Sequence, residues 1–158
     1  MTSLFYVLFD LLIIGYIIYS WYWQAVVDYP GRYRVSSIIW AVVFVYVSIS
    51  WNFIDITQAG APVLLAVFLV MSIMDGVSGL GEKRIVISGY VRRTIKYSDL
   101  DQITLINAPL TSNKSYVVME LQSKGHVYYI RFAKGMEDVI ATLKKHLGND
   151  VGIKIESL

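Results

Sequence analysis

Three long apolar stretches occupy the first half of the chain. They cover residues 4–26, 35–54 and 58–76. A helix that crosses the hydrocarbon core of a bilayer needs about 20 mostly apolar residues. The third stretch begins with Gly60 and Pro62, and proline is tolerated in a first helical turn because the N–H groups there have no helical partner. The pattern predicts three transmembrane helices within a transmembrane domain of residues 1–81.

A cleaved signal peptide and the core helices of a water-soluble protein are the alternatives. No Lys or Arg precedes the first stretch, and Trp21, Tyr22 and Trp23 stand where a cleavage site would need small residues. These aromatic residues, with Tyr19 and Tyr29, are typical of the belt at a membrane interface. The stretches are apolar on all sides, whereas a soluble helix has a polar face. Both alternatives are therefore disfavoured.

The charged residues are distributed unevenly along the chain. Before Glu82 there are four Asp and two Arg, a net charge of −2, and from Glu82 onward twelve basic and eight acidic residues give +4, which together make the overall +2. Arg32 and Arg34 follow the first stretch, Lys83 and Arg84 follow the third, and the second loop has no Lys or Arg. Basic short loops stay in the cytoplasm. We therefore expect the N-terminus outside and the C-terminal domain inside.

The second half of the chain, residues 82–158, shows the pattern of a small α+β domain. Gly76, Gly79 and Gly81 are interpreted as the linker that leaves the membrane. Strands, a polar loop and one amphipathic helix then follow, and antiparallel strands before a single C-terminal helix are the order of a pleckstrin-homology-like (PH-like) module. The predicted strands are 84–88, 91–97, 102–107, 115–122, 126–132 and an edge strand at 151–155; the loop is 108–114 and the helix 136–147.

Several runs in this half resemble a known group of sequences. They are RIVIS at 84–88, IKYS at 95–98, YVVMELQ at 116–122, VYYIRF at 127–132 and MEDVIATLKKHLG at 136–148. In their order and spacing after three apolar stretches, they resemble the YobD-like family of uncharacterised small bacterial membrane proteins. The resemblance implies a multi-pass protein of the bacterial cytoplasmic membrane with a compact cytoplasmic β-domain, and it brings no functional residues.

Residues that carry out catalysis are scarce. The chain has no Cys, which excludes disulfides, thiolate metal sites and a Cys nucleophile. His126 and His146 have no partner at metal-ligand spacing, and the pairs Asp99/Asp101 and Glu137/Asp138 are assigned to a turn and a helix start. We therefore expect no enzyme activity, no metal, no cofactor, no small-molecule substrate and no nucleic-acid partner.

Two sets of residues are candidates for binding. The basic residues after the third stretch could contact anionic lipid or an acidic partner; they are Lys83, Arg84, Arg92, Arg93 and Lys96. Asp10 lies inside the first stretch, where a carboxylate is costly and indicates either a polar contact or a side chain that reaches the headgroups.

These features favour a non-enzymatic membrane accessory or regulatory protein. Its cytoplasmic domain would bind a protein partner or anionic lipid, and it would modulate a transporter or give immunity against a pore-forming bacteriocin. The alternative is a subunit of a homo-oligomeric transporter or channel, whose partners would be its own copies.

The orientation predicts the side of the membrane on which the chain ends. A fluorescent protein that matures only in the cytoplasm should be bright when it is fused after Leu158, because the basic loops hold the C-terminal domain inside. An enzyme reporter that is active only outside the cell should be inactive at the same position. The reverse pair of results would contradict the orientation.

Overall fold

The computed structural model describes residues 3–89, 93–111, 114–147 and 152–157. Over these residues the protein has four α-helices and two β-sheets, which agrees with the predicted combination of helices and a small α+β domain. The chain divides into two compact units, one made of Met1–Tyr22 with Arg34–Gly76 and the other of Trp23–Tyr33 with Val77–Leu158. The division therefore differs from the boundary predicted between residues 81 and 82.

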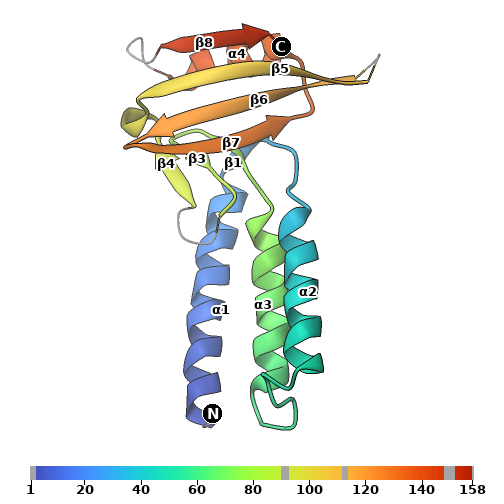
Figure 1. The fold of residues 1–158 in the computed structure, drawn as a ribbon. Coiled ribbons are helices and arrows are strands. Elements are labelled where there is room, and N and C mark those ends of the chain that lie inside the picture. Colours follow the sequence, from blue (N-terminus) through green and yellow to red (C-terminus); the bar gives the residue numbers. More distant parts are fainter. Residues whose placement is uncertain (1–2, 90–92, 112–113, 148–151, 158) are drawn as a thin grey trace. The chain divides into compact units, whose positions relative to one another are not determined.

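The first unit contains three helices: α1 (Ser3–Ala25), α2 (Ser36–Ser50) and α3 (Ala61–Asp75). Helices α1 and α3 run in the same direction and α2 runs opposite to them (Figure 1). Two backbone conformations with positive φ limit α2 and α3, namely Asn52 at 53° and Gly60 at 96°. These helices are therefore shorter than the segments 35–54 and 58–76.

Length separates α1 from the other two helices. Among the described residues, α1 is the one helix that is long and apolar enough to cross a bilayer, over Leu4–Ala25. A signal sequence or a buried core helix would share this length and composition, so α1 alone is compatible with membrane association and shows no more. Helices α2 and α3 have 15 residues each, and their length does not support the predicted second and third crossings.

The helical unit buries several polar and small side chains and exposes most of its large apolar ones, while Tyr6, Ile13 and Leu65 are buried. Leu12 and Trp40 are each 71% exposed to the surroundings, while Ala41 and Ala61 are buried. The buried polar residues of this unit are Asp10, Ser20, Ser37, Ser48, Ser72 and Asp75. A helical unit in water has the opposite arrangement, because burial of apolar surface drives its folding.

The second unit contains a four-stranded antiparallel sheet that the sequence did not reveal. Its order is β1-β2-β3-β4, with β1 at Val27–Pro30, β2 at Gly79–Gly81, β3 at Arg84–Val86 and β4 at Thr94–Lys96. The loop after the first apolar stretch thus supplies β1, and the residues interpreted as a linker supply β2. The predicted strand 84–88 is shortened to β3, and the predicted strand 91–97 contains β4, with residues 91 and 92 outside the described residues.

The close approach of β1 to β2 explains why position 79 is a glycine. A Cβ atom on Gly79 would lie 2.5 Å from Cγ1 of Val27 and 2.6 Å from the backbone oxygen of Tyr29. No carbon atom tolerates such contacts, so β1 can pair with β2 only because Gly79 has no side chain. Gly79 is therefore required by the pairing of β1 with β2 and is not simply part of a linker.

The other sheet has the order β7-β6-β5-β8 (Figure 1). Strands β5 (Gln102–Thr111), β6 (Lys114–Ser123) and β7 (His126–Phe132) are antiparallel, and β8 (Ile153–Ser157) pairs in parallel with β5 at the edge. The predicted hairpin of β6 and β7 and the predicted edge strand are confirmed.

The polar loop predicted at residues 108–114 is wrong, because β5 and β6 continue through most of it. Pro109 lies in this segment, and proline has no N–H group to donate to a neighbouring strand. In the described residues the pairing of β5 with β8 ends at Asn107. Pro109 therefore lies where β5 has β6 alone as its neighbour, a position that proline tolerates.

Helix α4 (Met136–His146) packs on the core of the second unit. Val139 and Leu143 are buried, and Ile140 and Leu147 pack against them as the predicted apolar face requires. The core joins both sheets with this helix; its buried members are Leu80, Ile85, Ile87, Ile95, Tyr97, Leu100, Ile103, Leu105, Val117, Met119, Leu121, Ile130, Phe132, Val139 and Leu143.

The steric requirement at Gly79 predicts a stability difference between two glycine variants. Gly79→Ala should lower the free energy of unfolding by about 1–3 kcal/mol, because the added methyl group meets the backbone of β1. Gly152→Ala is the control, since nothing lies within 4 Å of the atom it adds. Thermal unfolding followed by tryptophan fluorescence measures both, and equal midpoints would contradict the close approach.

Candidate functional site

Three of the five predicted basic residues lie together at one end of β3 and β4. Arg84 pairs with Lys96 in the strand register. The next pair, Ile85 with Ile95, is buried in the core. Lys83 directly precedes β3, and the side chains of Lys83 and Lys96 are exposed. We call Lys83, Arg84 and Lys96 the basic face.

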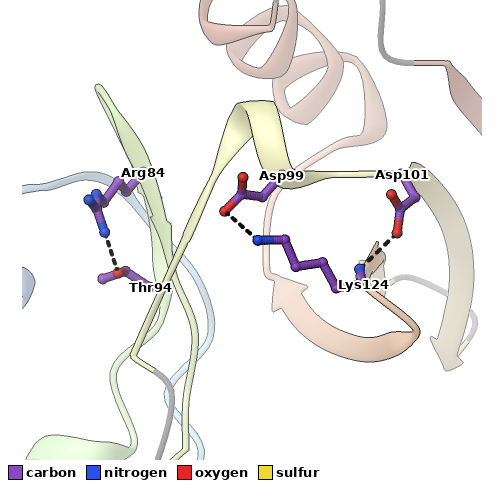
Figure 2. Close-up of polar contacts among 5 residues, drawn as sticks. All are labelled: Arg84, Thr94, Asp99, Asp101 and Lys124. Atoms are coloured by element: carbon purple, nitrogen blue, oxygen red, sulfur yellow. Dashed lines mark hydrogen bonds and ion pairs between the residues drawn. The ribbon is translucent and has the colours of Figure 1, made fainter.

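Arg84 is the oriented member of the basic face. Its Nη1 donates a hydrogen bond of 3.2 Å to Oγ1 of Thr94 (Figure 2). Its guanidinium carbon lies 5.1 Å from the centre of the Trp23 ring, an arrangement in which the aromatic face attracts the cation. Trp23 was interpreted only as part of an interfacial belt, and no sequence pattern showed that it lies against Arg84.

Arg92 and Arg93 do not join the basic face. Arg93 is 1% exposed, and its Nη1 donates to the backbone oxygen of Ile87 at 3.1 Å. A buried guanidinium is costly unless it is hydrogen-bonded, so this side chain supports the connection of β3 to β4 and cannot contact lipid or a partner. Arg92 lies outside the described residues.

Asp10 lies within the helical unit, where it is 7% exposed. A Cβ atom on Gly60 would be 3.8 Å from Oδ2 of Asp10, and Gly60 is the N-terminal cap of α3. The start of a helix carries a partial positive charge, which stabilises a nearby carboxylate. Among the described residues, the buried Oδ1 atom has no hydrogen-bond partner. Asp10 is therefore buried close to the start of α3.

The carboxylates of Asp99 and Asp101 hold a turn. Asp101 Oδ2 accepts a hydrogen bond of 2.8 Å from the backbone N–H of Lys124, and Asp99 Oδ2 lies 3.7 Å from Lys124 Nζ (Figure 2). Lys124 and Gly125 both have positive φ, at 51° and 77°, as a two-residue hairpin turn requires. The pair thus fixes the β6–β7 turn.

Tyr29 shows how strongly β1 belongs to the second unit. Its ring lies 5.5 Å from that of Phe132, and Lys134 Nζ lies 4.2 Å from its centre. Burial raises the pKa of the Tyr29 hydroxyl, and the charge of Asp138 raises it further. Tyr29 therefore packs against the core of the second unit. Strand β1 has only four residues, which are too few to show the alternation of apolar and polar positions that predicts a strand from sequence.

Tyr97 connects β2 with α4 in the second unit. Its hydroxyl donates to the backbone oxygen of Gly81 at 2.8 Å, and its ring stacks on that of His146 at 5.8 Å. Burial raises the pKa of Tyr97, and Asp28 adds to the effect. His146 therefore has a packing role, while His126 is exposed at the start of β7.

The described residues contain no group of three or more His, Cys, Asp or Glu side chains that could hold a metal ion. The chain matches no family model, no curated protein and no solved structure. The assignment to the YobD-like family stays a prediction. The arrangement offers cationic groups on a surface, which suits non-covalent binding of an anion.

The turn at Lys124 predicts different effects for its two carboxylates. Asp101→Ala should lower the free energy of unfolding by about 1 kcal/mol or more, because the Lys124 N–H loses its acceptor. Asp99→Ala is the matched control, and it should change stability by about 0.5 kcal/mol or less because an exposed ion pair contributes little. Thermal unfolding of the full chain measures both. An effect of Asp99→Ala as large as that of Asp101→Ala would contradict this account of the turn.

Proposed function

We propose that this chain is a multi-pass protein of the bacterial cytoplasmic membrane and a non-enzymatic accessory protein. Three helices would cross the bilayer, and a PH-like cytoplasmic domain would bind anionic lipid headgroups through the basic face while the helices meet a membrane-protein client. A transporter, or a pore-forming bacteriocin against which the protein gives immunity, would be such a client. The observation that carries the proposal is the reversed polarity of the helical unit.

The reversed polarity favours lipid as the solvent of all three helices. Ser37, Ala41 and Ser48 are buried on α2 at near-helical spacing, whereas Trp40 and Tyr46 point outward. Small residues between helices and large apolar residues outside are typical of membrane helices, which gain nothing from hiding apolar surface. In water, the exposed aromatic and aliphatic side chains of α1, α2 and α3 would form a large and unfavourable surface.

The charges support the orientation of the domain toward the cytoplasm. Arg32 and Arg34 follow α1, and Lys83 and Arg84 follow α3, whereas Asp55 is the one charged residue in the loop between α2 and α3. Basic loops of this kind are retained inside the cell. With three crossings, the N-terminus would then lie outside.

Two sheets, most of whose strands are antiparallel, and one helix near the C-terminus support a PH-like domain. The sheets β1-β2-β3-β4 and β7-β6-β5-β8 share one core with α4. The PH-like fold is proposed because strands of both sheets precede the helix in the chain. Strand β8 is then an additional strand at the sheet edge.

Anionic lipid is favoured over an acidic protein as the ligand of the basic face by the position of Trp23. This residue belongs to the last turn of α1, and tryptophan near the end of a membrane helix prefers the headgroup region. Arg84 lies over the same ring. If α1 crosses the bilayer, the guanidinium of Arg84 is therefore held at the level of the lipid phosphates.

The alternative, a homo-oligomeric transporter or channel subunit, has weaker support. A pore between copies needs polar side chains on the outer surface of the helices. Asp10, Ser48 and Ser72 are instead buried within one chain. The described helices therefore offer an outer surface that suits lipid or an apolar helix of a client.

Lipid binding can be measured through thermal stability in nanodiscs. Anionic lipid should raise the unfolding temperature of the wild-type chain relative to zwitterionic lipid, since each basic residue near the surface contributes about 1 kcal/mol. The double variant K83Q/K96Q should lose most of this gain, and added salt should weaken it.

The matched control is K144Q/K145Q, which removes two exposed charges from α4 and leaves the basic face intact. It should keep the full gain in anionic lipid. An equal loss in both double variants would show that net charge alone is responsible and would refute the basic face as the binding site.

A further inference from the structure

The turn between α2 and α3 carries an exposed apolar surface. Trp51 is 69% exposed and Phe53 is 67% exposed, and their rings meet edge to face with centres 5.8 Å apart. Ile56 is also exposed. A loop in contact with water is usually polar, and three large apolar side chains within six residues require an apolar or interfacial environment.

Much of the backbone of this turn forms hydrogen bonds within its own chain. The N–H groups of Trp51, Asn52, Phe53, Ile54, Gln58 and Ala61 all donate to backbone oxygens between Val47 and Gln58. Asp55 Oδ1 accepts from the N–H of Thr57 at 3.0 Å and from its hydroxyl at 2.6 Å. Non-helical backbone at membrane depth must have such internal partners, because lipid offers none.

Helices α2 and α3 are shorter than the hydrocarbon core of a bilayer is thick. Each of α2 and α3 has 15 residues and is therefore about 22 Å long, against a hydrocarbon core about 30 Å thick. Neither helix alone is long enough to span the hydrocarbon core. The apolar turn joins the two helices at the end where Gly60 lies close to Tyr6 in α1, so it lengthens the hairpin toward the outer side of the proposed bilayer.

We infer that the α2–α3 turn is a membrane anchor, with Trp51, Phe53 and Ile56 inserted at the boundary of headgroups and acyl chains in the outer leaflet. The inference rests on the proposed multi-pass arrangement and explains how two short helices complete it. Tryptophan and phenylalanine are suited to this boundary.

Asp55 marks the outer limit of the anchor. The hydrogen bonds from the Thr57 side chain and backbone lower the pKa of this exposed carboxyl, so it stays ionised at neutral pH. An ionised carboxylate with its hydroxyl neighbour remains at the level of the headgroups. The depth to which the anchor inserts is therefore limited by Asp55.

Tryptophan fluorescence tests the anchor in the full chain, which has four tryptophans. The variant W21F/W23F/W40F keeps Trp51 alone and is reconstituted into phosphatidylcholine vesicles without other proteins. Its emission should be blue-shifted, and lipids brominated near the headgroup should quench it about twofold more than lipids brominated near the chain ends. Aqueous iodide should have little effect.

A companion variant separates failure of the anchor from failure of the three-span arrangement. W21F/W23F/W51F keeps Trp40, which points outward from α2, and brominated lipid should quench it if α2 is in the bilayer. Quenching of Trp40 by lipid, together with quenching of Trp51 by iodide, would overturn the anchor and assign the apolar turn to a protein partner. Iodide quenching of both residues would overturn the three-span arrangement itself.

Discussion

The pairing of β1 with β2 is the interaction on which the second unit depends. It joins a segment between two helices to a segment after the third, and it requires the missing side chain of Gly79. Gly31 extends this connection, because its N–H donates to the backbone oxygen of Ser78 and the N–H of Arg32 donates to that of Arg131 at the free edge of β7. The chain therefore passes between the two units three times. A fragment of residues 82–158 would lack β1, β2 and the buried Leu80, and it would not be the whole domain.

The two units bury different kinds of side chain. The α+β unit has an apolar core that includes Ile103, Leu105 and Phe132, and it also buries Arg93. The helical unit buries serines and Asp10, as the proposed lipid environment would allow. Trp23 belongs to α1 and also lies under Arg84 in the second unit. Trp23 thus connects the last turn of α1 with the basic face.

Sequence reasoning succeeded where a long periodic pattern existed. The apolar stretches became helices, the alternation of β6 and β7 became a hairpin, and the spacing of Val139 and Leu143 placed α4 on the core. It failed where a short segment depends on a distant partner. Four residues cannot show that β1 is a strand, and Gly79 and Gly81 are read as a linker unless their tight contacts with β1 are known.

The candidate site was predicted in part for the same reason. Lys83, Arg84 and Lys96 were grouped by sequence, and Arg84 and Lys96 meet through strand register. Arg93 was assigned to the same surface because a longer strand was expected. It precedes β4, and its guanidinium turns inward to Ile87. Burial of an arginine depends on a carbonyl from another segment, which no local pattern reveals.

The central claim is that α2 and α3 cross the bilayer, and thiol accessibility tests it most directly. The chain has no cysteine, so a single exposed thiol can be introduced at the outer turn by Ala59→Cys and on α4 by Lys145→Cys. In intact cells, a maleimide that cannot cross membranes should label the first variant, and it should label the second only after the membrane is opened. Labelling of both variants, or of neither, in intact cells would contradict the claim.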